Sequence, residues 1–433
     1  MVATIIISLL TCISLILSIL LFPKITIFKK QINSYWLICL IGGLLIVAFN
    51  CISFNEVIDG LTSNASINPI KILILFISMT FISVFLDEIG FLKYLASVVI
   101  SECKSNQRVL FLMLYALVSV LTIFTSNDIV ILTVTPFICY FAKNAKINPI
   151  PYLVAEFCAA NTWSMMLIIG NPTNIYLATI ANINFIEYLL VMILPTIAAG
   201  TIQISLMILL FKNTLKQPII LDNQKENVKD RTSLTIALIH LLVCLVLLTI
   251  SSYISLAMWI ICLVCALSLI LDISIYYIIK HKNFVSVKNT FKRLPFELIP
   301  FVISMFVIVL ALNKQGVSSY IGNLLKDNFI ILKYGLSSFV SANIMNNIPM
   351  SVFFATIPNM TSTIDYHKAI FSTIIGSNIG AFLTPIGALA GIMFTNLLVK
   401  HDVKYSFKDF IKYGVIISVP TLLAALIALE IIL

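Results

Sequence analysis

The chain has 433 residues, of which 60% are apolar and only 10% are charged, and its formal net charge is +9. Soluble domains have roughly 25% charged and about 45–50% apolar residues, so this composition excludes a soluble catalytic or nucleic-acid-binding domain. The sequence instead indicates a polytopic membrane protein, in which surplus Lys and Arg gather in the cytoplasmic loops. The nine cysteines lie mostly inside apolar runs and are interpreted as small buried hydrophobic residues, so neither a disulfide framework nor a metal site is predicted.

The N-terminal part contains apolar runs of about 20 residues, the length that a transmembrane helix needs. The first two predicted spans are Val2–Phe22 and Ser34–Ser53, and we expect residues 1–70 to form N-terminal transmembrane helices. The run Val2–Phe22 is longer than a signal-peptide core of about 7–15 residues and lacks a basic start, so we expect it to remain as a span.

Residues 71–211 are predicted to form a first inverted repeat. Its opening span is Lys71–Phe91. The next apolar run, Val109–Phe141, is interrupted by TSND (125–128) and has basic loops at both ends, which favours a re-entrant hairpin over two full spans. Tyr152–Thr179 is a span broken at GNPTN (170–174), and Phe185–Phe211 returns across the membrane.

The second half follows a long polar stretch at 212–232, which we interpret as a cytoplasmic linker. Residues 233–296 are predicted to form a central helix pair and a basic loop. Residues 297–433 form the second inverted repeat, with its own hairpin and broken helix. Its predicted segments are Glu297–Asn313, the hairpin Phe329–Pro358, the broken span His367–Thr395 and Phe407–Leu433. We therefore predict an all-α fold with about ten transmembrane helices and two re-entrant hairpins.

Two sequence clusters occur once in each half. Asn161–Gly170 aligns with Asn378–Gly387 without a gap, and Asn127-Asp128 aligns with Asn346-Asn347. With the basic loops on the cytoplasmic side, the first hairpin enters from inside and the second from outside. Inverted repeats with broken helices that meet near the bilayer midplane are a transporter architecture. The sequence thus predicts a secondary transporter.

The polar interruptions are the candidate binding site for a small solute or ion. Non-helical backbone at membrane depth is tolerated only where protein or a water-filled cavity covers it, and half-helix ends attract ions. The alternative is that these side chains only form hydrogen bonds between helices. The candidate residues are Ser126, Asn127, Asp128, Asn161, Gly170, Asn171, Thr173, Asn174, Asn343, Asn346, Asn347, Ser377, Asn378 and Thr384.

Two carboxylates are candidate proton carriers. Asp128 stands at a predicted hairpin tip, where a buried acid is costly and usually functional. Glu156 precedes Asn161 in the broken span, and its alternative is an interfacial acid. Asp87-Glu88 and Glu297 lie near span ends and are predicted to be interfacial.

The interrupted segments resemble arsenite efflux permeases. FTSNDIVILTVTPF (124–137) resembles the "ND…LTP" hairpin of that family, and NIMNNIPM (343–350) with IIGSNIGAFLTPIGALAGIMF (374–394) resembles its second half. The resemblance covers roughly residues 71–433. It implies arsenite or antimonite efflux in exchange for protons, a dimer in many members, and in some a separate ATPase subunit. The family's paired residues correspond to Asn127, Asp128, Asn346 and Asn347.

One segment departs from this pattern, because AEFCAANTWSMMLIIGNPTN (155–174) looks more like the sodium/proton antiporter and anion-permease branches of the ion transporter superfamily. Cys139 and Cys158 flank the predicted site, so their thiols could bind arsenic, but apolar packing is the simpler interpretation.

Three classes of function follow. The leading hypothesis is arsenite/antimonite–proton exchange by alternating access in a bacterial cell membrane, because a cage of Asn, Ser and Thr without Lys or Arg suits an uncharged trihydroxide. The second is a sodium-coupled dicarboxylate or inorganic anion permease, or a sodium/proton antiporter. The third is a channel or membrane enzyme, but no paired acid/base set or P-loop occurs. We expect H⁺ (or Na⁺) as the coupling ion, no cofactor, lipid as surroundings and no nucleic-acid partner.

Overall fold

The structure, a computed structural model, describes residues 2–22, 24–27, 30–62, 68–102, 106–217, 228, 230–251, 253–325, 328–357, 360 and 362–433. In this part of the chain, regular structure is helical except for one antiparallel hairpin of β1 (Lys24–Ile27) and β2 (Lys30–Asn33). Among the residues that the structure describes, seven helices are long and apolar enough to cross a membrane, and several shorter apolar helices accompany them. The predicted all-α polytopic fold is confirmed.

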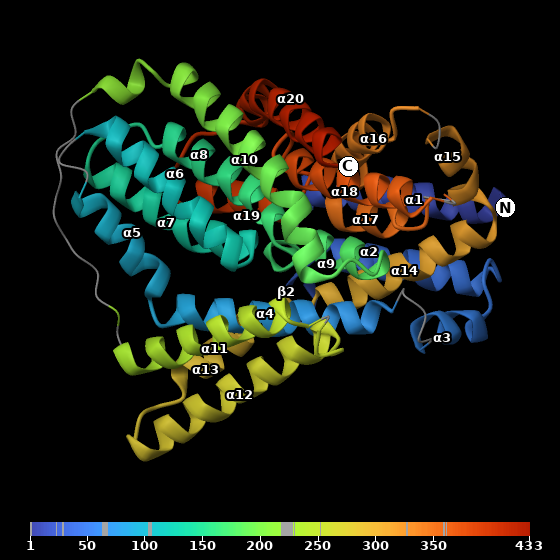
Figure 1. The fold of residues 1–433 in the computed structure, drawn as a ribbon, viewed down its shortest axis with the longest axis horizontal. Coiled ribbons are helices and arrows are strands. Elements are labelled where there is room, and N and C mark those ends of the chain that lie inside the picture. Colours follow the sequence, from blue (N-terminus) through green and yellow to red (C-terminus); the bar gives the residue numbers. More distant parts are fainter. Residues whose placement is uncertain are drawn as a thin grey trace.

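The order of helices in the first half is repeated in the second half (Figure 1). The first half contains α1 (Val2–Leu21), α2 (Tyr35–Ala48), α3 (Phe54–Thr62), α4 (Pro69–Glu88), α5 (Phe91–Glu102), α6 (Gln107–Phe124), α7 (Asn127–Asn144), α8 (Ile150–Trp163), α9 (Pro172–Ile180) and α10 (Phe185–Leu210). The second half contains α11 (Arg231–Thr249), α12 (Met258–Ile279), α13 (Val285–Arg293), α14 (Leu298–Lys314), α15 (Val317–Leu325), α16 (Ile330–Met345), α17 (Asn347–Phe354), α18 (Thr363–Gly380), α19 (Leu389–Lys400) and α20 (Phe407–Ile432). Short 3₁₀ turns are η1 (Ser164–Met166), η2 (Ile168–Gly170) and η3 (Thr214–Lys216).

The two predicted hairpins are α6–α7 and α16–α17, and the two broken spans are α8–α9 and α18–α19. The second arm of the second hairpin, α17, has 8 residues, whereas the corresponding arm of the first hairpin, α7, has 18, so the two second arms differ in length. Most of the predicted linker 212–232 lies outside the described residues. The division of the chain into five parts stays a prediction.

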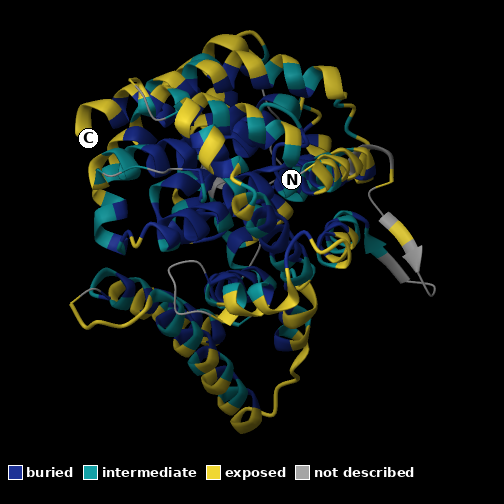
Figure 2. Ribbon diagram, turned by 90° about the vertical axis from the view of Figure 1, so that its right-hand side faces the viewer, coloured by how far each residue is buried: buried dark blue, intermediate teal, exposed yellow. Residues whose placement is uncertain are grey.

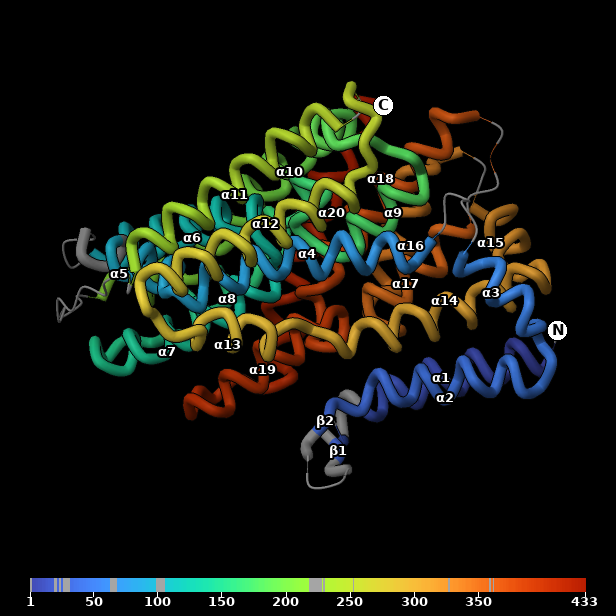
Figure 3. The backbone as a smooth tube through the Cα atoms, turned by 90° about the horizontal axis from the view of Figure 1, so that it is seen from below, coloured from blue at the N-terminus to red at the C-terminus, as the bar shows by residue number. Residues whose placement is uncertain are grey.

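Helices of the two halves pack across one another. Helix α2 lies along α14 of the second half, α12 lies along α4 of the first half, and α10 lies along α20 (Figure 3). Figure 2 shows the buried residues gathered in the main body, whereas the α11–α12 pair projects from it. Apolar side chains on that pair, such as Leu242 and Leu271, are about 60% exposed and suit a lipid environment.

Helices α16 and α18 approach closely at Gly376. A Cβ atom at this glycine would lie 2.0 Å from the Ser338 Oγ and 2.4 Å from the Gly335 carbonyl oxygen, which is backbone and cannot move aside cheaply. We predict that Gly376→Ala lowers the free energy of unfolding by about 1–3 kcal/mol, the usual cost of overpacking. Thermal unfolding in detergent measures it, with Gly376→Ser as a larger probe. Equal melting temperatures for all three proteins would contradict this prediction.

Candidate transport site

A network of buried amides joins the two halves at the centre of the protein. The Asn378 side-chain oxygen, on α18, accepts hydrogen bonds from Ser164 Oγ (3.1 Å) and from Asn171 Nδ2 (2.9 Å). The Asn378 Nδ2 donates to Asn174 Oδ1 at 2.7 Å and to the Ile374 carbonyl at 2.8 Å. Both acceptor positions and both donor hydrogens of the Asn378 side chain are therefore hydrogen-bonded, and three of these four bonds join α18 to the break between α8 and α9. The repeated Asn seen in sequence is the point where the halves meet.

The tip of the first hairpin is attached to this network. Asn127, the first residue of α7, donates from Nδ2 to Asn161 Oδ1 at 3.0 Å, and the single Ser164 hydroxyl hydrogen is shared between Asn378 Oδ1 and the Asn161 carbonyl, which lies 2.9 Å away. A Cβ at Gly170 would lie only 2.2 Å from the Ser164 carbonyl oxygen, so this break requires glycine. The Asn127 Oδ1 and the Ser126 Oγ are buried without a partner among the described residues. These two oxygens remain available to a bound solute or ion.

The cap of α9 brings in the remaining first-half candidate. Thr173 donates from its backbone N–H and its Oγ1 to the Asn171 Oδ1, at 3.2 and 3.1 Å. Asn174 Nδ2 donates to the carbonyls of Ser164 and Leu167 at 2.8 and 3.2 Å. The polar residues of the broken span therefore stabilise their own turn, as the alternative interpretation expects.

The second-half candidates form a separate cluster between the tip of α16–α17 and the loop after α18. Asn346 has φ 72° and ψ 150°, an uncommon backbone conformation for a residue with a Cβ atom. It is held there by its Nδ2, which donates to the Ile386 carbonyl at 3.0 Å, while the Asn347 N–H donates to the Gly387 carbonyl at 2.9 Å.

A threonine completes this second cluster. Thr384 Oγ1 donates to the Asn343 Oδ1 at 2.8 Å, and the Asn343 Nδ2 donates to the Gly380 carbonyl at 3.0 Å. The Ser377 Oγ is buried without a partner among the described residues. The structure thus brings Asn378 to the first-half residues and leaves Asn343, Asn346, Asn347 and Thr384 in a cluster of their own.

The second arms of the two hairpins both begin with an asparagine. Asn127 is the first residue of α7 and Asn347 is the first residue of α17. The motif alignment pairs Asn127 with Asn346 instead, a difference within the one or two residues over which helix ends vary, so the pairing of Asp128 with Asn347 stays a prediction.

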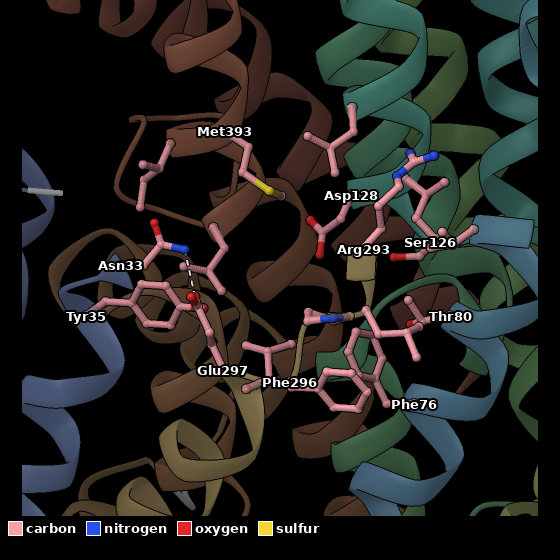
Figure 4. Close-up of a pocket in the computed structure, with 18 of the residues that line it drawn as sticks. Asn33, Tyr35, Phe76, Thr80, Ser126, Asp128, Arg293, Phe296, Glu297 and Met393 are labelled. Atoms are coloured by element: carbon pink, nitrogen blue, oxygen red, sulfur yellow. Dashed lines mark hydrogen bonds between the residues drawn. The ribbon is translucent and has the colours of Figure 1, made fainter. Parts of the chain in front are cut away.

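Asp128 lines a cavity of about 460 Å³ (Figure 4). In the described part of the chain its carboxylate makes no side-chain hydrogen bond or ion pair. The walls come from α4, α7, α19, the start of α2 and the connection between α13 and α14. The residues that line it include Ser34, Phe76, Thr80, Ser126, Leu132, Arg293, Glu297, Met393 and Asn396. The hydroxyls of Ser34, Thr80 and Ser126, three residues that line the cavity, are buried without a partner among the described residues.

A far smaller cavity occupies the equivalent place in the other half. It measures about 20 Å³ and lies between α4, α9, α14 and α17, with Ile348, Val352, Pro172 and Tyr176 in its wall. By the order of helices, α9 and α17 correspond to α19 and α7, which line the large cavity. Phe76 and Leu298 line both spaces. One of two related spaces is therefore open and the other is nearly closed.

Charged residues that sequence analysis treated as interfacial belong to the large cavity or its wall. Glu297 lines it and accepts hydrogen bonds from Asn33 Nδ2 (2.6 Å) and Tyr35 Oη (3.2 Å). In the view of Figure 4, Asp128 and Arg293 come from one side of the cavity and this group from the other. Asp87 is buried and pairs with Arg293. Asp87 lies at the end of α4 and Glu297 directly precedes α14, so their interfacial position stays a prediction.

Arg293 also corrects the expectation that the site lacks a cation. Nothing in the sequence distinguishes Arg293 from its neighbours. It ends a basic loop segment, and the positive-inside rule already accounts for the Lys and Arg residues of such a loop. Only the packing of α13 against α4 shows that it reaches the cavity.

Glu156 lies elsewhere. Its side chain is buried in α8, and both carboxylate oxygens accept from Thr135 Oγ1 of α7, at 3.0 and 2.9 Å. It is not among the residues that line the Asp128 cavity. Cys139 and Cys158 are buried free thiols. The proton-carrier role of Glu156 stays a prediction.

The fold and the cavity define a polytopic membrane transporter of the cell membrane. The model of the citrate transporter family (CitMHS) matches residues 25–376, so the chain belongs to that family. The arsenical pump membrane protein of Escherichia coli (strain K12) is 26% identical over 368 residues, covering 82% of this chain and 84% of that protein. A putative arsenical pump membrane protein of Bacillus subtilis (strain 168) is 24% identical, covering 79% and 83%.

Among solved structures, the YdaH transporter of Alcanivorax borkumensis superposes with a TM-score of 0.59 at 12% identity. The superposition covers 99% of this chain and 98% of that one, which supports the fold over its whole length. The resemblance drawn from the sequence motifs is confirmed at the level of the family.

Proposed function

We propose that this protein exports arsenite or antimonite in exchange for protons by alternating access. The observation that carries the proposal is Asp128, a carboxylate without a fixed partner among the described residues, which faces a solute-sized cavity at the start of a hairpin helix. A carboxyl group in this position can take up and release a proton as the solute leaves and enters.

The pair of unequal cavities supports the alternating-access part. An inverted repeat can exchange the conformations of its halves, which would close the 460 Å³ cavity and enlarge the 20 Å³ one. The large cavity lies beside Asn33, Arg293 and Asn396, which adjoin loops rich in Lys and Arg. By the positive-inside rule this cavity opens to the cytoplasm, as an exporter requires for loading.

The charges at the cavity favour an uncharged solute. Asp128 and Glu297 face it, and the guanidinium of Arg293 is already paired with two carboxylates. A trianion would meet two negative groups here, whereas a neutral trihydroxide can donate hydrogen bonds to carboxylate and hydroxyl oxygens. The names of the relatives from Escherichia coli and Bacillus subtilis agree with this solute class.

The test is arsenite accumulation in everted membrane vesicles that contain the protein. An acid interior should drive arsenite inward, and collapse of the proton gradient should stop it. Vesicles without the protein give the background. Absence of gradient-driven accumulation above that background would reject arsenite–proton exchange.

The second candidate is a sodium-coupled organic or inorganic anion carrier, which the family match favours. The buried unpaired oxygens of Ser126 and Asn127, adjacent at the tip of the first hairpin, are of the type that binds a sodium ion. The same vesicles with a sodium gradient and labelled citrate distinguish this candidate, which needs sodium-dependent citrate flux.

A further inference from the structure

Arg293, the last residue of α13, is bound by two acids at the end of α4. Its Nη2 donates to Asp87 Oδ2, and its Nη1 donates to Glu88 Oε2 at 3.0 Å. Asn289, one turn earlier on α13, donates from Nδ2 to the other Glu88 oxygen at 2.9 Å. Both acids are therefore positioned by α13, and the arginine is the cation of a three-residue cluster on the cavity wall.

The cluster carries more negative than positive charge. Two carboxylates face one guanidinium, and the Asp87 Oδ1 is buried with no partner among the described residues. The Asp87 side chain is 5% exposed and that of Arg293 is 34% exposed, so the arginine is the member that reaches solvent in the cavity. A guanidinium can bind a carboxylate through two parallel N–H···O hydrogen bonds. In this cluster, Nη1 and Nη2 of Arg293 donate to protein carboxylates.

We propose that Asp87 and Glu88 determine solute specificity by holding Arg293 away from anions. Arg293 is a group with which the cavity could bind a carboxylate or oxyanion. Its two acids neutralise its charge and take two of its five N–H donors, so an anionic solute meets a guanidinium whose charge is already compensated. The inference rests on the proposed function, in which the Asp128 cavity holds the solute.

The experiment frees Arg293 without changing the shape of its partners. In Asp87→Asn/Glu88→Gln the guanidinium loses both charged acceptors, and citrate should become an inhibitor of arsenite uptake. We expect half-inhibition at a citrate concentration about tenfold or more below that of wild type, since charge-assisted pairs with arginine are strong. Adding Arg293→Gln to the double variant should remove this sensitivity.

A second readout works without transport. Thermal unfolding of the purified protein in detergent, with and without citrate, should show stabilisation only in the double variant. If wild type moves no arsenite, the proposed function fails, and this measurement still decides whether the acids block an anion site. Should the double variant fail to fold, Glu88→Gln alone is tested, because Asp87 still anchors α13.

Two results would overturn the inference. One is stabilisation of wild type by citrate that Arg293→Gln abolishes, because the arginine would then already bind anions. The other is a folded double variant with no gain in citrate binding or inhibition.

Discussion

Asp128→Asn is expected to reduce gradient-driven arsenite accumulation in everted vesicles at least about tenfold, because an amide cannot exchange a proton at membrane depth. The substitution keeps the size of the side chain and removes only its titration. Since the carboxylate has no hydrogen-bond partner or ion pair among the described residues, the fold should tolerate the change. Initial uptake rates with and without an acid interior measure the effect.

The coupling step can be separated from solute binding. With arsenite on both sides and no proton gradient, Asp128→Asn should still exchange labelled for unlabelled arsenite. Asp59→Asn is the matched control, because Asp59 is an exposed acid on α3, and it should behave as wild type. Full gradient-driven accumulation by the Asp128 variant would refute its role as the proton carrier.

Asn378→Ala is expected to destabilise the protein by roughly 3–5 kcal/mol, the largest effect among the site residues. The change removes an amide that is fully buried and leaves the Asn171 Nδ2 and the Asn174 Oδ1 each short of one hydrogen bond, whereas Ser164 keeps the Asn161 carbonyl. Each buried polar group left unpaired costs about 1–3 kcal/mol, with part of this cost recovered by relaxation. Thermal or denaturant unfolding in detergent gives the difference.

The matched control is Asn55→Ala, at an exposed position on α3, which should change stability by less than about 0.5 kcal/mol. If both variants have the same stability, the central network contributes nothing to joining the halves. Because the network links α8–α9 with α18, we also expect loss of transport in the Asn378 variant before it unfolds.

The architecture was predictable where a short sequence pattern determines the local structure. A run of polar residues inside an apolar segment, such as TSND at 125–128, marks a break in any membrane helix, and the structure has α6 end at Phe124 and α7 begin at Asn127. The match of Asn161 with Asn378 was also visible, because both residues occupy the same place in repeated helices. Asn378 contacts the first half through Ser164, Asn171 and Asn174, which the alignment alone did not indicate.

What depends on contacts between distant segments was not predictable. Arg293 and Asp87 are far apart in sequence, and each looks ordinary beside a span end, so their pairing needs the packing of α13 on α4. The helix boundaries at the hairpin tips were likewise hidden, because only the folded backbone shows two non-helical residues before α7 and one before α17.

The crossed packing of the two halves has a consequence for biosynthesis. Helix α2 packs mainly against α14, and α4 packs against α12. These first-half helices are therefore synthesised before the second-half helices that cover them. Neither half can complete its packing alone, and the chain must hold α2 and α4 in the membrane until residues 258–314 have been inserted. The protein therefore folds as one unit assembled late in synthesis, and not as two domains that fold one after the other.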